Sequence, residues 1–357
     1  MPHTPSWKEN FVAKLTEWFL AAMRPLPWRE TYDPYSVWIS EIMLQQTQME
    51  RGVSYFTAWM RRFPDIASVA GADEDAILSA WEGLGYYSRA RNLHAAAKRI
   101  MTEHGGEFPR DHAAIRALPG VGEYTAGAIA SIAFNLPVPA VDANVLRIFA
   151  RILDIDSPPT DKAVKDRLTA LARSLMPLAP PRLINQGLME FGALVCGKNP
   201  RCGECPLTDF CRAHRLGTVP DRPLKKEKPG VRILETVAGV LRRDGKIYIR
   251  KRPPNGLWAG LWEFPGGTLE PGEAPERAAL RHIMTETGIA AAVDAAIGIV
   301  RHGYTTNRVV MHGFLCTAAD EPSGAPQLEG VWAAPEDLGR FAFAAGHRKL
   351  LERLGWK

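Results

Sequence analysis

The sequence predicts two domains, an all-helical region followed by a smaller α+β domain. At about 150 residues per domain, its 357 residues provide for two. From residue 7 to 216, apolar residues recur at the three- and four-residue spacings typical of helices. From residue 233, segments rich in β-branched residues, such as ETVAGVLRR and RVVMHGFLC, flank one helical stretch at 274–287. We therefore expect domains over 1–216 and 233–357.

The stretch between them, residues 217–232, has the composition of a solvated linker. It contains three prolines, two glycines and a lysine-rich run. Most of the formal net charge of +5 lies within 221–232, so the overall charge does not by itself establish a nucleic-acid partner. No apolar run approaches the ~18 residues of a membrane span, and the first residues lack the pattern of a signal peptide. We expect a soluble cytoplasmic protein without a membrane partner, associated with the nucleoid if it is bacterial.

A glycine-rich turn, LPGVGEYTA at 118–126, joins two predicted helices. Pro119 ends the first helix, and the free N–H groups at the start of the second suit a phosphate. An ordinary helix–helix turn is the alternative. The whole pattern resembles the helix-hairpin-helix motif of the DNA glycosylase superfamily. The resemblance implies that Leu118, Gly120, Val121 and Gly122 bind the DNA backbone.

Twenty residues beyond Gly122, Asp142 precedes a predicted helix at 144–152. A helix N-cap is one role for this aspartate, and the resemblance adds that of the catalytic carboxylate, which Asn144 would orient. Where relatives such as endonuclease III have a lysine that forms a Schiff base, this chain has Tyr124, which has no amine. We therefore expect base removal without an efficient strand-nicking step, with Tyr124 assisting at the sugar.

Glu41 lies on a predicted helix among apolar neighbours. A partly buried glutamate has a raised pKa and can act as a general acid, whereas a solvated one does not. The run SEIMLQQT at 40–47 resembles the MutY family of adenine glycosylases. This resemblance implies that Glu41 protonates the adenine. It also implies a base pocket with DNA contacts from Trp28, Arg29, Leu44, Gln45, Gln46, Thr47 and Gln186.

The run GLGYYSRARNL at 83–93 combines a glycine turn with two tyrosines and two arginines. This composition suits base stacking with phosphate contact, although plain helix packing also uses such residues. The run again resembles the MutY family, which implies that Tyr86 intercalates beside the damaged base and that Arg91 contacts the DNA.

Four of the five cysteines lie within sixteen residues, with the spacing Cys196-x5-Cys202-x2-Cys205-x5-Cys211. Four thiolates hold either zinc or an iron–sulfur cluster. The spacing resembles the [4Fe-4S] loop of endonuclease III and the MutY family, usually x6, x2, x5, and implies that cofactor. The first gap is one residue shorter here. Cys316 is expected to be an inert buried thiol.

Residues 267–289 resemble the Nudix box of nucleotide pyrophosphohydrolases. Glu273 and Glu286 keep metal-binding positions, but His282 and Thr285 replace two others, so we expect a recognition module rather than a hydrolase. With NGLWAGLWEFPGG at 255–267, the region resembles the MutT-like C-terminal domain of the MutY family. The resemblance implies an 8-oxoguanine-reading loop, with the Thr305 hydroxyl accepting from N7–H. That loop comprises Tyr304, Thr305, Thr306 and Asn307.

Together, these resemblances imply a monomeric base-excision-repair glycosylase acting on double-stranded DNA. It would flip out adenine from an A:8-oxoguanine or A:G mispair and hydrolyse the glycosidic bond. Three alternatives stay open. They are a glycosylase for another mismatched or oxidised base, a nucleotide pyrophosphohydrolase fused to a DNA-binding region, and a mismatch-binding protein without catalysis.

Overall fold

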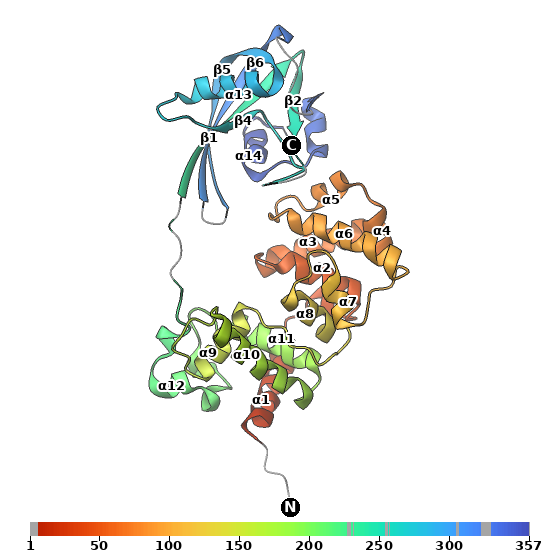
Figure 1. Ribbon diagram of the computed structural model, residues 1–357, viewed down its shortest axis with the longest axis vertical. Helices are drawn as coiled ribbons and strands as arrows, with labels where there is room; N and C mark the ends of the chain where they lie inside the picture. Colours follow the sequence, from red (N-terminus) through yellow and green to blue (C-terminus); the bar gives the residue numbers. More distant parts are fainter. Residues whose placement is uncertain are drawn as a thin grey trace, which may run out of the picture. The chain divides into compact units, whose positions relative to one another are not determined.

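The computed structural model describes residues 6–226, 230, 232–253, 256, 258–304, 307–322 and 330–356 (Figure 1). They form two compact units. The helical unit comprises Met1–Gly71 and Asn92–Glu227, and the C-terminal unit comprises Ala72–Arg91 and Lys228–Lys357. The predicted fold class, all-α followed by α+β, is confirmed. The division falls inside the predicted linker, but residues 72–91, predicted within the helical region, group with the C-terminal unit.

The helical unit consists of helices of 16 residues or fewer. In chain order they are α1 (Trp7–Ala22), η1 (Pro27–Arg29), α2 (Pro34–Leu44), α3 (Met49–Arg62), α4 (Ile66–Gly71), most of α6 (Ser88–Glu103), α7 (His112–Ala117), α8 (Glu123–Ile132), α9 (Ala143–Ile152), α10 (Lys162–Leu175), η2 (Met176–Leu178), α11 (Pro181–Leu194), η3 (Cys202–Glu204), η4 (Thr208–Phe210), α12 (Arg212–Leu216) and η5 (Val219–Asp221). The aromatic side chains of Phe11, Phe149 and Phe191 anchor a core shared by α1, α9 and α11.

Helices α2 and α8 pack against each other in the interior and position much of the site. α2 starts sharply, because Asp33 caps it by accepting from the Ser36 N–H at 2.8 Å and Pro34 occupies its first turn. Along α8, residues 125–132 are all buried. Gly127 allows this close packing, since a Cβ there would lie 2.4 Å from the Pro139 carbonyl oxygen.

The C-terminal unit contains a single mixed sheet with helices on both faces. Its elements are α5 (Glu74–Ala80), β1 (Arg232–Arg243), β2 (Lys246–Lys251), β3 (Trp262–Glu263), β4 (Gly266–Thr268), α13 (Pro275–Thr287), β5 (Ile289–Tyr304), β6 (Asn307–Pro322), β7 (Gly330–Ala333), η6 (Pro335–Arg340) and α14 (Ala345–Arg353). The main strand order is β3-β2-β1-β6-β5, with β1 and β6 parallel and β5 and β6 antiparallel. One face packs on α13 and the other on α14, and Cys316 is buried beneath α13 as expected.

Two ion pairs and one hydrogen bond hold segment 72–91 to the rest of the C-terminal unit. Asp75 pairs with Lys251 at 2.8 Å, and Glu82 pairs with Arg348. The Tyr87 hydroxyl donates to a backbone carbonyl 3.4 Å away, that of Phe343. These partners are separated by more than 170 residues, which explains why helical periodicity alone assigned the segment to the helical domain.

Two residues at the start of the predicted linker make side-chain contacts with the helical unit. The Thr218 hydroxyl donates to Asp154 at 2.6 Å, and Arg222 forms an ion pair with the same carboxylate at 2.9 Å. Both side chains of the ion pair are largely buried. Residues 217–222 therefore group with the helical unit.

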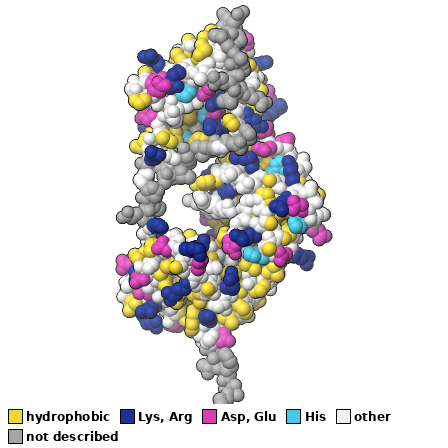
Figure 2. All heavy atoms as spheres, viewed as in Figure 1, with side chains coloured by type: hydrophobic (Ala, Val, Ile, Leu, Met, Phe, Trp, Pro, Cys, Tyr) yellow, Lys and Arg dark blue, Asp and Glu magenta, His cyan; other side chains and the backbone are white. Residues whose placement is uncertain are grey.

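Charged side chains of both signs are interspersed over the face shown in Figure 2, consistent with the small net charge. Within the described part of the chain, no helix combines the length and apolar composition needed to span a bilayer.

Candidate active site

One cavity of about 610 Å³ in the helical unit brings together most of the predicted catalytic and base-pocket residues. Its walls come from η1, α2, the following turn, α8, the start of α9 and α11. This volume lies in the range of ordinary small-molecule sites. The predicted residues that line it are Trp28, Arg29, Glu41, Leu44, Gln45, Gln46, Thr47, Tyr124, Asp142, Asn144 and Gln186.

Glu41 lies on the cavity wall of α2 and is only 9% exposed. Burial raises the pKa of its carboxyl to about 7, and the nearby Asp142 charge acts in the same direction. The Tyr124 hydroxyl donates to Glu41 Oε2 at 3.1 Å, and this hydrogen bond opposes the rise in the Glu41 pKa. Burial also raises the pKa of Tyr124 itself, which therefore stays a neutral donor. A carboxyl with a pKa near 7 holds a transferable proton at neutral pH.

Asp142 is fixed at the start of α9 as the predicted N-cap. Its Oδ1 accepts from the Val145 N–H at 2.8 Å, and its Oδ2 accepts from Asn144 Nδ2 at 2.7 Å. Asn144 is held in turn by Arg147, whose guanidinium donates to Asn144 Oδ1 at 2.8 Å and to the Cys196 carbonyl at 2.8 Å. The carboxyl group of Asp142 is thus held in a fixed orientation by a backbone donor and a side-chain amide.

A buried ion-pair network on the cavity wall was missed by the sequence reasoning. Glu190 pairs with Arg24 at 2.6 Å and with Arg29 at 2.9 Å, and Arg29 donates to Gln186 Oε1 at 3.0 Å. Burial acts to raise the pKa of Glu190, but hydrogen bonds from both arginines outweigh it and lower the pKa to about 2. The sequence did offer one indication of Glu190: it follows Gln186 by four residues and therefore lies on the same helix face.

The other predicted DNA contacts lie outside this cavity. Leu118, Gly120, Val121 and Gly122 form the turn between α7 and α8, where the two apolar side chains are buried. Val121 N–H donates to the Leu118 carbonyl at 3.1 Å and closes the turn.

Tyr86 and Arg91 belong to the C-terminal unit. Tyr86 is 45% exposed and has a positive φ of 48°, while Arg91 donates to the Ala259 carbonyl. Of the predicted lesion-recognition loop, Tyr304 ends β5 and pairs with Asn307 at the start of β6. Thr305 and Thr306 lie outside the described residues.

The four clustered cysteines surround one pocket next to Arg151. Burial raises the pKa of Cys205 to about 11, and the neighbouring thiols act in the same direction. Arg151 donates to Cys196 Sγ at 3.3 Å, which places a cation beside the thiol group. Among the described residues, no three Cys, His, Asp or Glu side chains converge on a point where one metal ion would bind. Four thiols around a pocket, with a cation beside them, fit a polynuclear cluster bound by four thiolates.

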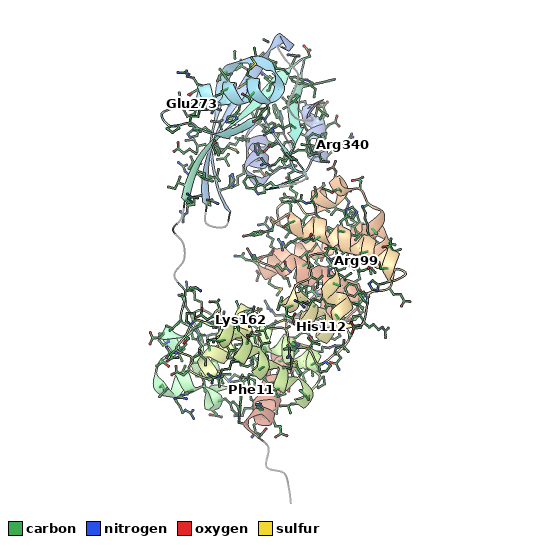
Figure 3. The ribbon with its side chains drawn as sticks, viewed as in Figure 1. Phe11, Arg99, His112, Lys162, Glu273 and Arg340 are labelled. Atoms are coloured by element: carbon green, nitrogen blue, oxygen red, sulfur yellow. The ribbon has the colours of Figure 1, made fainter. Side chains whose placement is uncertain are left out.

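Both remaining box glutamates of the C-terminal unit are engaged by cations. Glu273, labelled in Figure 3, makes two bonds of 2.7 Å with Arg281, whose hydrogen bonding lowers the pKa of that carboxyl to about 2. Glu286 pairs with Arg250 at 3.0 Å and with His282 at 3.3 Å. His282 therefore places a potential cation beside Glu286, at a position where the Nudix box has a metal-binding glutamate. Each of the two remaining box glutamates is therefore neutralised by a side chain of this chain.

Three family profiles match successive parts of the chain. Residues 39–174 match the HhH-GPD superfamily of base excision DNA repair proteins, 198–211 match the iron-sulfur binding domain of endonuclease III, and 236–353 match the NUDIX domain. The second match covers three of the four cysteines, and Cys196 completes the ligand set. The cofactor of this loop is a [4Fe-4S] cluster.

Relatives of known activity match over most of the chain. The adenine DNA glycosylase of Mus musculus is 36% identical over 76% of this chain and 63% of its own length. That of Buchnera aphidicola subsp. Baizongia pistaciae is 38% identical over 68% of this chain and 69% of its own length. The structure of a thermostable thymine-DNA glycosylase aligns over 58% of this chain with 28% identity and a TM-score of 0.53. The chain spans less than two thirds of the mouse relative and more than two thirds of the Buchnera relative, and it belongs to the adenine DNA glycosylase family.

Proposed function

We propose that the protein excises adenine from duplex DNA where it is mispaired with 8-oxoguanine or guanine, and that it does so without an efficient lyase step. The observation that carries this proposal is the pairing, in one cavity, of a neutral-pH acid with an oriented carboxylate, Glu41 and Asp142. Hydrolysis of a glycosidic bond uses two carboxyl groups, one that protonates the leaving group and one that stabilises the charge on the sugar.

In the proposed reaction, adenine is flipped from the duplex into the cavity. Glu41 transfers its proton to the base, which weakens the bond to the sugar and leaves the base as a neutral product. Asp142, held by Asn144 and the Val145 N–H, stabilises the positive charge that develops on the sugar. Water then adds to the sugar cation and gives up a proton to the ionised Glu41, which restores the acid. Tyr124 keeps Glu41 oriented through its 3.1 Å hydrogen bond.

We expect no lyase step because the described lining of the cavity offers no primary amine. Tyr124 has no amine, and no lysine is among the described residues that line the cavity. A Schiff base with the sugar needs a primary amine, and the arginines there stay protonated.

The iron–sulfur cluster would be held by Cys196, Cys202, Cys205 and Cys211. When bound, it supplies four metal–thiolate bonds that cross-link a loop whose regular structure consists of single 3₁₀ turns. The proposed chemistry in the cavity takes place on Glu41, Asp142 and Tyr124.

Single-turnover release of adenine from duplexes with A opposite 8-oxoguanine, G or T tests the proposal. We expect rapid release opposite 8-oxoguanine and G, strand breaks only after alkaline treatment, and little borohydride trapping. Efficient trapping would refute the monofunctional assignment. Release of another base, such as thymine, with adenine left intact would refute the assigned substrate. Hydrolysis of 8-oxo-dGTP without adenine release would favour the pyrophosphohydrolase alternative.

A further inference from the structure

Glu190 is the most deeply buried charged residue among the described residues that line the cavity containing Glu41, and the proposed reaction does not use it. Its Oε1 accepts from Arg24 Nε at 2.6 Å and from the Arg24 backbone N–H at 3.2 Å. Its Oε2 accepts from Arg24 Nη2 at 3.1 Å and from Arg29 Nη2 at 2.9 Å. Holding the segment between α1 and η1 against α11 is the simpler explanation for these bonds. Stability alone does not require ions there, because well-packed apolar side chains of similar volume often stabilise a protein at least as well.

The hydrogen bonds continue from Glu190 to the side-chain amide of Gln186. Arg29 is held by Glu190 and by the Arg24 carbonyl at 3.0 Å, and its Nε donates to Gln186 Oε1 at 3.0 Å. At the other end of the amide, Gln186 Nε2 donates to the Arg182 carbonyl at 3.2 Å. An arginine has donors only, so the amide oxygen has to face Arg29 and the amide nitrogen has to face the carbonyl. The orientation of the Gln186 amide is therefore set by Arg29, and that of Arg29 by Glu190.

An amide fixed in one orientation can distinguish purines by the group at position 6. Among the described residues, Gln186 makes these two side-chain hydrogen bonds, which leaves one oxygen lone pair and one N–H on the cavity wall. Adenine offers an amino donor beside a ring-nitrogen acceptor, and a glutamine amide pairs with both. A purine with a carbonyl at position 6 would place an oxygen against the amide oxygen. An amide free to turn over would offer its N–H to that carbonyl instead.

We propose that Glu190 is a positioning residue for base specificity, which through Arg29 holds the Gln186 amide in the orientation that accepts a 6-aminopurine and rejects a 6-oxopurine. This inference rests on the proposed function, because it requires a purine flipped into the cavity. The role needs a carboxylate, since only an acceptor on both oxygens suits two arginines. A glutamine at position 190 would turn an N–H toward an arginine N–H and break one branch of the network.

Single-turnover base release from duplexes with adenine or hypoxanthine opposite 8-oxoguanine tests this inference in the full-length, cluster-containing protein. Hypoxanthine is adenine with a carbonyl in place of the 6-amino group. We expect Glu190→Gln to lower the ratio of adenine release to hypoxanthine release about tenfold, the equivalent of one hydrogen bond. The same two bases are compared in every variant, so their intrinsic difference as leaving groups cancels. A purely structural role would slow both reactions by one factor and leave the ratio unchanged.

Arg24→Gln is the milder second variant. Glu190→Gln leaves two arginines without their anion, which also lowers stability. Arg24→Gln keeps the bond between Glu190 and Arg29 but removes both side-chain bonds from Arg24 to the carboxylate. We expect it to lower the same ratio severalfold, in the same direction as Glu190→Gln but by less.

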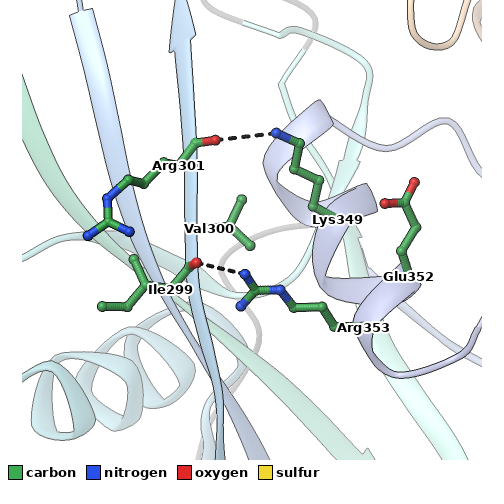
Figure 4. A pocket seen from close by; sticks show the side chains of 6 residues that line it. All are labelled: Ile299, Val300, Arg301, Lys349, Glu352 and Arg353. Atoms are coloured by element: carbon green, nitrogen blue, oxygen red, sulfur yellow. Dashed lines mark hydrogen bonds between the residues drawn. The ribbon is translucent and has the colours of Figure 1, made fainter.

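Each variant has a matched control outside the cavity. Asp154→Asn neutralises a largely buried anion of the helical unit that pairs with Arg222 at 2.9 Å. Arg353→Gln removes an arginine of the C-terminal unit, which lines a pocket of about 530 Å³ and donates to the Ile299 carbonyl at 2.9 Å (Figure 4). Both controls should keep the wild-type ratio.

An unchanged ratio in both Glu190→Gln and Arg24→Gln would overturn the inference, as would an equal fall in the controls. If the wild-type protein releases adenine while these variants keep its ratio, the role of Glu190 alone is refuted. Wild-type protein that releases no adenine would refute the proposed function itself.

Discussion

Glu41 owes its chemistry to its surroundings rather than to its residue type. A solvated glutamate is ionised at neutral pH, whereas burial on α2 raises the pKa of this one to about 7. The sequence indicated this environment through the apolar neighbours of Glu41 on α2. It gave no sign of the Tyr124 hydrogen bond, which joins residues 83 positions apart.

Glu41→Gln should abolish catalysis and stabilise the fold at alkaline pH. Removing a general acid costs about 10²–10⁴-fold in rate, so single-turnover adenine release should fall at least 100-fold while duplex binding persists. Because the folded-state pKa is raised, wild-type stability decreases between pH 4.5 and about 7. The variant lacks that loss and should be more stable than wild type by about 3 kcal/mol at pH 8, with no such difference below pH 4.5. Urea unfolding at the two pH values measures this, and an equal difference at both would contradict it.

Tyr124→Phe should move the alkaline limb of the pH–rate profile to higher pH. Wild-type excision should fall as pH rises through about 7, because Glu41 loses its proton there. The phenol stabilises the ionised carboxylate, so its removal raises the Glu41 pKa further. A shift of about one pH unit is expected from one hydrogen bond to a charged group. A limb that stays in place in single-turnover assays would show that the hydroxyl does not act on Glu41.

At the scale of elements, the helix termini and turns were the most predictable features. The starts of α2 and α9, capped by Asp33 and Asp142, follow from the sequence because a cap is a local interaction. The residues that α11 places on the cavity wall were less predictable than these caps. Gln186 was expected there, but Glu190 was not, because its role depends on Arg24 and Arg29 from a distant segment.

The α7–α8 turn provides a test with a built-in control. Gly120 has a φ of 74°, and a Cβ on it would lie 2.6 Å from the Asn92 Cβ. Gly122 has a φ of −84°, and a Cβ on it would meet no atom within 4 Å. Gly120→Ala should therefore lower the free energy of unfolding by at least about 1–2 kcal/mol, whereas Gly122→Ala should change it by less than about 0.5 kcal/mol. Equal effects in denaturant titrations would contradict this account of the turn.

At the scale of the whole molecule, residues 72–91 are the main departure from the predicted division. The segment carries Tyr86, the predicted intercalating residue, and it groups with the C-terminal unit. Its helical periodicity is real, since α5 and the start of α6 lie within it. Periodicity reports local structure and does not indicate which distant surface a helix packs against.

Arg348→Gln should loosen segment 72–91 locally. The pair that Arg348 forms with Glu82 is mostly buried, so its loss should raise hydrogen exchange at 74–90 severalfold, equivalent to roughly 1 kcal/mol of local stability. The control Arg340→Gln removes an exposed arginine and should leave exchange unchanged there. Unaltered exchange in Arg348→Gln would show that this ion pair does not hold the segment.

The sequence by itself determined the two fold classes, the two carboxylates proposed to be catalytic, the cysteine set and the two replaced positions of the Nudix box. These features reside in residue types and in spacings along single elements. Only the tertiary structure decided the arginine network around Glu190 and the attachment of 72–91. Each of these depends on which side chains from distant segments meet, because burial and charge pairing are properties of the packed molecule rather than of the chain.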